Sequence, residues 1–276
     1  MTIKQITEAA ANGNAEQLNL LIAQSKNSIN FGEALAYASE NGHAECVKIL
    51  IHVSKPNDSQ ALWLAAQNGR TECVKLLISA SDPKDFGSEA LKCASENGHT
   101  ECVKLLIPVS DPKHNDSYAL RLASEKGHTE CVKILIPVSD PKAGNSYALR
   151  WASENGHTEC VKFLIPVSDT KANKSQALRC ASNNGFTECV KLLIPVSAPK
   201  AKNSEALRLA AENNRYECVE LLLPYSDISK WGENEWRNIN SGTQNIIKSY
   251  FSKISLIESV LPNNNKISKP KKSHKI

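Results

Sequence analysis

The residues with the clearest chemical potential are histidines and cysteines that recur three positions apart. An imidazole and a thiol at this spacing could bind zinc or act as the base and nucleophile of a hydrolase. The repetition disfavours both functions. Zinc needs four ligands within about 2.3 Å of one point, and a column of residues that advances ~10 Å per unit cannot supply them. A catalytic centre also needs only one copy. We therefore expect no enzymatic activity, no catalytic residue, no metal and no cofactor. The pairs are His43/Cys46, His99/Cys102, His128/Cys131 and His157/Cys160.

The cysteines also mark a tandem repeat. Five of the six intervals between seven of them are 29 residues long, and each follows a glycine or its replacement by four residues. A unit this short must bury its apolar face against copies of itself. Stacked units lie ~10 Å apart, whereas a disulfide needs Cα atoms within ~7 Å, so we expect free, buried thiols. The seven positions are Cys46, Cys73, Cys102, Cys131, Cys160, Cys189 and Cys218.

The segment 115–142 illustrates how one unit should fold. Two apolar sets with helical spacing predict two short helices, and Gly127 between them can end the first in a left-handed conformation. Ser117 is placed to cap the first helix, and Pro137 to stop the second. The connection is so short that the two helices must be antiparallel. The sets are Ala119, Leu120, Leu122 and Ala123, then Cys131, Val132, Ile134, Leu135 and Ile136.

This unit resembles the ankyrin repeat. Residues 120–136 read LRLASEKGHTECVKILI, with the leucine, the two small residues, the Gly-His pair and the apolar second helix of that family. The resemblance covers residues 6–223 as eight units. It implies an all-α helix-turn-helix solenoid that binds protein partners and is not an enzyme.

Two departures from the family pattern affect what the resemblance implies. Residues 118–121 read Tyr-Ala-Leu-Arg where the family has Thr-Pro-Leu-His. The unit is also about four residues shorter than the usual ~33, and the deficit falls in the loop. We therefore expect truncated β-hairpin fingers, with proline-containing loops in their place.

The sequence predicts that the chain has three parts. Residues 1–223 form the array, 224–261 a divergent ninth unit that caps its C-terminal end, and 262–276 a disordered tail. The net charge is +4, and the tail contains Lys266, Lys269, Lys271, Lys272 and Lys275 without an acid, so the array is close to neutral. Nucleic-acid or nuclear-import association through this tail is the alternative function.

The units differ most on the outward face of the first helix, at nine, six and two positions before each glycine. Stacking aligns these positions into what we call the ladder, and tyrosine, tryptophan and arginine are typical of energetically important interface positions. The alternative interpretation is that Arg121–Glu125 and its equivalents are surface pairs that contribute a few tenths of a kcal/mol and serve solubility, and both interpretations can hold. Arg179 favours binding, because its own helix gives it no acidic neighbour. The predicted partner-binding residues are Trp63, Tyr118, Arg121, Tyr147, Arg150, Arg179 and Arg208.

Among these, Tyr118, Tyr147 and Arg179 are expected to be the strongest contacts. We expect a monomer with an unidentified protein partner. No stretch approaches the ~20 apolar residues needed to span a bilayer, and residues 1–17 do not read as a secretory signal. Unpaired thiols fit the reducing cytoplasm or nucleus, or the host cytoplasm for an effector.

Overall fold

The computed structural model describes residues 3–25, 30–54 and 59–260 of the 276-residue chain. All regular secondary structure in this part of the chain is helical, and it contains no strand. The all-α prediction is therefore confirmed. The predicted disordered tail, with the lysines between 266 and 275, and residue 261 lie outside the described residues.

The helices follow one another in antiparallel pairs. The first helix of each pair ends at a tight turn, and the second leads through a loop to the next pair. The pairs are α1 (Ile3–Ala11) and α2 (Ala15–Ala23), α3 (Gly32–Asn41) and α4 (Ala44–Ile51), α5 (Ser59–Gln67) and α6 (Thr71–Leu77), α7 (Asp85–Glu96) and α8 (Thr100–Leu106), α9 (His114–Lys126) and α10 (Thr129–Leu135), α11 (Ala143–Glu154) and α12 (Thr158–Leu164), α13 (Ala172–Asn184) and α14 (Thr187–Leu193), α15 (Ala201–Glu212) and α16 (Tyr216–Leu222).

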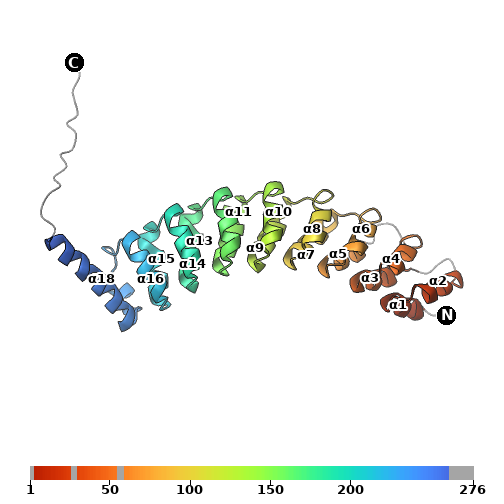
Figure 1. Cartoon of the computed structure of the whole chain (residues 1–276), viewed down its shortest axis with the longest axis horizontal. Coiled ribbons are helices and arrows are strands. Elements are labelled where there is room, and N and C mark those ends of the chain that lie inside the picture. Colours follow the sequence, from red (N-terminus) through yellow and green to blue (C-terminus); the bar gives the residue numbers. More distant parts are fainter. Residues whose placement is uncertain (1–2, 26–29, 55–58, 261–276) are drawn as a thin grey trace, which may run out of the picture.

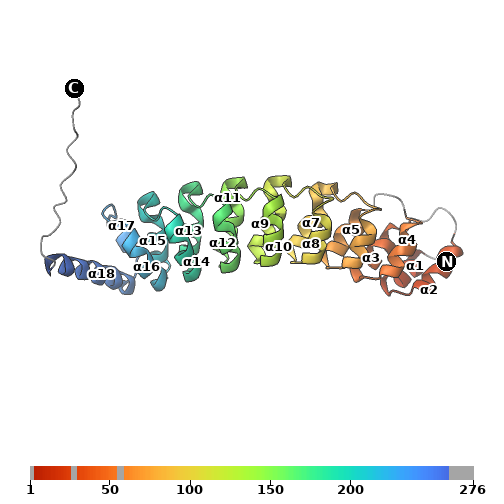
Figure 2. The ribbon, with the colours of Figure 1, turned by 45° about the horizontal axis from the view of Figure 1, so that its top comes forward.

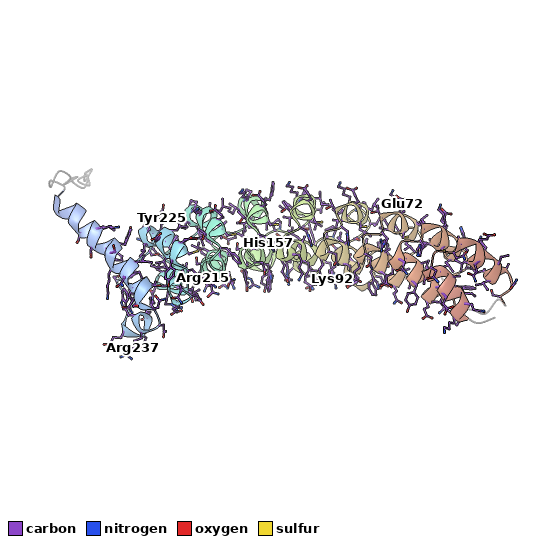
Figure 3. All side chains as sticks on the ribbon, turned by 60° about the horizontal axis from the view of Figure 1, so that its bottom comes forward. Glu72, Lys92, His157, Arg215, Tyr225 and Arg237 are labelled. Carbon is purple, nitrogen blue, oxygen red and sulfur yellow. The ribbon has the colours of Figure 1, made fainter. Side chains whose placement is uncertain are left out.

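Stacked side by side, the pairs form a curved solenoid (Figure 1). A view turned by 45° shows the same regular succession from α1 to α16 (Figure 2). Neighbouring first helices pack more closely than neighbouring second helices. The first helices therefore form the inner row of the arch and the second helices the outer row. Figure 3 accordingly places Lys92 of α7 on the inner side and Glu72 of α6 on the outer side.

A continuous seam of small and branched apolar side chains holds the pairs together. In the pair α9 and α10, Ala119 and Leu120 are buried with Cys131, Val132 and Leu135, as predicted. The same positions are buried in the neighbouring pairs, so that all of them belong to one core. Each large aliphatic side chain removed from water contributes about 1.5–3 kcal/mol.

Gly127 ends α9 in the left-handed conformation, with φ 79°, and its N–H donates to Ala123. This agrees with the role predicted from the sequence. Pro137 acts as expected too, because α10 ends at Leu135 and the chain continues as a short 3₁₀ helix. The 3₁₀ helices are η1 (Ile136–Val138), η2 (Ile165–Val167), η3 (Ile194–Val196) and η4 (Leu223–Tyr225).

The predicted helix cap at Ser117 is wrong. Residues 115–117 all have positive φ and form a left-handed turn before the regular part of α9. The Ser117 Oγ points to the next pair, where it accepts a hydrogen bond from the Asp140 N–H at 2.8 Å. Ser88, Ser146, Ser175 and Ser204 make the same bond to the following loop. The serine column therefore links successive pairs.

The last pair is followed by α17 (Glu233–Arg237) and the 20-residue helix α18 (Ser241–Val260). The hydrophobic spacing predicts such a closing helix, and α18 packs against α16. Trp231, Ile239 and Ile247 are buried there. That this segment is a divergent ninth unit, and that the array has eight units, remain predictions.

Candidate protein-binding face

The ladder lies on the inner row, and most of its side chains are half-buried. From α7 to α15, every ladder position is neither fully exposed nor buried, because adjacent first helices are close enough to cover one another's side chains. Trp63 is half-buried as well, while Gln60 and Gln67 are exposed. The structure thus places the predicted residues on one surface, where adjacent first helices partly cover their side chains.

Cations and aromatic rings interlock along the middle of this face. The Arg121 guanidinium lies 4.8 Å from the ring centroids of both Tyr118 and Tyr147, so it bridges two pairs of helices. Arg150 lies 4.6 Å from Tyr147 and 4.9 Å from Trp151. Cation–π contacts at exposed sites contribute about 0.5–1 kcal/mol each. Arg121 and Arg150 are therefore each in contact with two aromatic rings of this face.

Trp151 was not among the predicted residues. It stands five positions before Gly156, one position from the ladder, and is half-buried beside Arg150. Most units have leucine or cysteine at this position, and these residue types favour a packing role rather than a binding role. The signal in the sequence was an aromatic residue in a column that otherwise holds mostly leucine and cysteine; Tyr37 is the other aromatic residue there.

Arg179 has an acidic partner after all, and it comes from the next pair of helices. Arg179 forms an ion pair with Glu205, and the two side chains are only 12% and 17% exposed. Lys202 and Arg208 also lie 3.3 Å from Glu205. Partial burial opposes ionisation of Glu205, but the hydrogen bond and charge of Arg179 outweigh it and lower the pKa of that carboxyl.

The expected pairs between residues four apart are present only in part. Arg208 and Glu212 lie 2.8 Å apart on α15. Glu125, by contrast, pairs with its neighbour Lys126 at 3.3 Å, and Arg121 stacks on tyrosine rings. In the central pairs, stacking between units has replaced the solubilising pair.

The histidine column links one pair of helices to the pair before it. His128 Nε2 lies 2.9 Å from the main-chain oxygen of Glu96, and His157 Nε2 lies 2.7 Å from that of Glu125. These carbonyls belong to the last turn of a first helix, where the helix itself offers no partner. His43 and His99 make the same contact, so this column stabilises the stack.

The cysteine column is buried and free, as predicted; all nine thiols are unpaired. Thr100 Oγ1 lies 3.5 Å from the Cys131 Sγ of the next pair. Burial raises the pKa of the Cys131 thiol, and it raises that of Cys73 to about 11. A buried thiol with a raised pKa is a poor nucleophile.

Two further observations concern the described residues as a whole. Across residues 3–25, 30–54 and 59–260, no three His, Cys, Asp and Glu side chains are grouped so as to hold a metal ion. In the same ranges, no helix combines the length and the apolar character needed to cross a membrane.

Antiparallel helix pairs, a shared apolar seam and an ordered inner face define a helical repeat solenoid. The family model for ankyrin repeats (3 copies) matches residues 6–86, 35–117, 79–146 and 149–231. The chain therefore belongs to the ankyrin-repeat family.

The chain is similar in fold to the ankyrin repeat protein EF0377, known from its crystal structure. The match has a TM-score of 0.50 and 22% sequence identity, and it covers 59% of this chain and 98% of that one. No curated protein matches the sequence. Ankyrin repeats generally mediate protein–protein interaction and are typically non-enzymatic.

Proposed function

We propose that this chain is a non-enzymatic binding module whose inner face contacts a protein partner. The observation that carries the proposal is the half-exposed column formed by Tyr118, Arg121, Tyr147, Arg150 and Trp151. Tyrosine, tryptophan and arginine dominate the binding energy of protein interfaces.

The mechanism is presentation of a rigid surface. The seam fixes the register of the inner helices, and the stacked side chains of the ladder already have restricted rotamers. Each rotamer-rich side chain that is ordered on binding costs about 0.5–1.5 kcal/mol. A partner that meets Arg121 and Tyr147 already stacked avoids part of this cost.

Capture from a lysate with alanine variants tests the proposal. We expect Tyr118→Ala/Tyr147→Ala/Arg179→Ala to lose the partners that the unaltered chain retains. The matched control is Lys133→Ala/Lys162→Ala/Phe163→Ala, because Phe163 and Lys133 make a cation–π contact on the outer row. Circular dichroism confirms that both variants remain helical. Equal recovery of partners by the two variants would show that the inner face does not bind them.

A further inference from the structure

A hollow of about 430 Å³ opens at the N-terminal end of the inner face, between α3 and α5. Glu33 and Glu40 lie one on either side of Tyr37 along α3, at the spacing that places them on one face of the helix. The side chains that line it and matter here are Glu33, Ala36, Tyr37, Glu40, Gln60 and Leu64.

The hollow lies at a ladder position that has no cation. From α7 to α15, the position six residues before the glycine is always a lysine or an arginine. In α3 the same position is Ala36, whose side chain ends at Cβ, so the volume that a long cationic side chain fills elsewhere is left open. The cations of α7, α9, α11, α13 and α15 are Lys92, Arg121, Arg150, Arg179 and Arg208.

The acidic groups that hold this cation in other units are still present in α3. Glu33 stands where Glu89 stands in α7, and Glu89 lies 2.5 Å from Lys92. Glu40 stands where Glu212 stands in α15, 2.8 Å from Arg208.

The aromatic group is retained as well. Tyr37 stands where Trp151 stands in α11, and the Trp151 ring centroid is 4.9 Å from the Arg150 guanidinium. All three positions around Ala36 therefore have counterparts that contact a cation elsewhere in the same chain.

We infer that this hollow binds a lysine or arginine side chain of the protein partner, which takes the place of the missing ladder cation. Within the described residues, neither Glu33 nor Glu40 has an ion-pair partner, and Tyr37 is 42% exposed. Two carboxylates and an aromatic face are complementary to an ammonium or guanidinium group. The inference rests on the proposed function, since it specifies the partner's chemistry at one end of the inner face.

A peptide titration tests this inference without the natural partner. The probe is the acetylated and amidated pentapeptide Gly-Ser-Lys-Ser-Gly, added to the ¹⁵N-labelled full chain and followed by NMR. Saturable shifts are expected at the amides of Gly32, Tyr37 and Gln60. A peptide with norleucine in place of lysine keeps the aliphatic stem without the charge, and it should produce no such shifts.

Charge-removing variants identify the groups responsible. Glu33→Gln/Glu40→Gln should weaken lysine-peptide binding about threefold or more, as expected for two partly exposed ion pairs. Glu45→Gln/Glu72→Gln makes the same charge change on the outer row, where both side chains are about 70% exposed, and should leave binding unchanged. Binding that is absent, equal for the norleucine peptide, or unaffected by Glu33→Gln/Glu40→Gln would overturn the inference.

A filling variant gives an independent readout. Ala36→Arg introduces the cation that the units from α7 to α15 carry, and it should abolish peptide binding while the chain stays at least as stable to urea. Ala36→Gln fills part of the same volume without the charge, which separates occlusion from ion pairing. Peptide binding that survives Ala36→Arg in a folded chain would contradict the inference. The Tyr118, Tyr147 and Arg179 variants test the proposed function separately, so the two can fail independently.

Discussion

The imidazole of His128 fills the space into which a side chain at Gly98 would project. A Cβ atom at Gly98 would lie 2.5 Å from His128 Nδ1, and Gly98 has φ +75°. The glycine therefore serves both the left-handed turn that ends α7 and the close approach of the next pair. The short loop and the stacking distance depend on the same residue.

Gly98→Ala is expected to destabilise the chain by about 1–3 kcal/mol, the cost of holding a non-glycine residue in a left-handed conformation. The displaced His128 ring adds to that cost. The measurement is the urea midpoint by circular dichroism. Gly242→Ala is the control, since it has no positive φ and its nearest neighbour is 3.4 Å away. Equal midpoints for both variants would show that the turn does not limit stability.

His128→Phe should keep the packing against Gly98 but lose the hydrogen bond to the Glu96 carbonyl. The expected loss is about 1 kcal/mol, typical of a hydrogen bond removed from a partly buried acceptor. Phenylalanine occurs naturally in this column as Phe186, where Asn184 instead donates to the Glu154 carbonyl at 2.7 Å.

Lys126 stands in the place of Asn184, so Lys126→Asn should rescue His128→Phe. Recovery of the urea midpoint in the double variant is the predicted result. Failure of the rescue would mean that the histidine contributes through packing rather than through its hydrogen bond.

The repeat, the burial of Leu120 and Cys131 and the left-handed Gly127 follow from the sequence, because each depends on contacts that recur at a fixed spacing. The left-handed turn at Ser117 does not, since a serine with positive φ is unfavourable on its own and is stabilised here by the loop of the next pair.

Contacts between units were harder to predict than contacts within them. The acidic partner of Arg179 is Glu205, 26 residues later, and it becomes a neighbour only when the pairs stack. The hollow beside Ala36 could not be predicted either, because it depends on the volume that a missing side chain leaves. The ladder itself was identifiable because its positions share one helix face.

The thiols should make stability fall at alkaline pH. Burial and the nearby Glu89 charge raise the pKa of Cys93 from 9.0 to about 12. Above pH 9 the unfolded chain releases this proton and the folded chain keeps it, so the unfolded state gains stability as pH rises. The contribution of the thiol is complete below its unfolded pKa and declines through the range up to about 12.

Urea midpoints measured between about pH 7 and pH 10 test this, since ordinary thiols ionise within that range. Cys93→Ala should lose stability at neutral pH but decline less steeply at high pH than the unaltered chain. Parallel curves for the two proteins would contradict the assignment to Cys93.

A double-mutant cycle between Arg121 and Tyr147 should show favourable coupling of about 0.5 kcal/mol or more, as expected for a partly covered cation–π contact. The variants are Arg121→Ala, Tyr147→Ala and their combination. The outer pair Lys133 and Phe163 provides the comparison, because Phe163 is 39% exposed and the coupling should be smaller. Coupling that is absent at Arg121 would mean that the ladder is not ordered in advance.

Hydrogen exchange of the full chain with and without a captured partner tests most directly whether the inner face binds. The account predicts slower amide exchange in α7, α9, α11 and α13, together with unchanged exchange in α8, α10 and α12. Protection of the outer helices, with the inner helices unaffected, would contradict it.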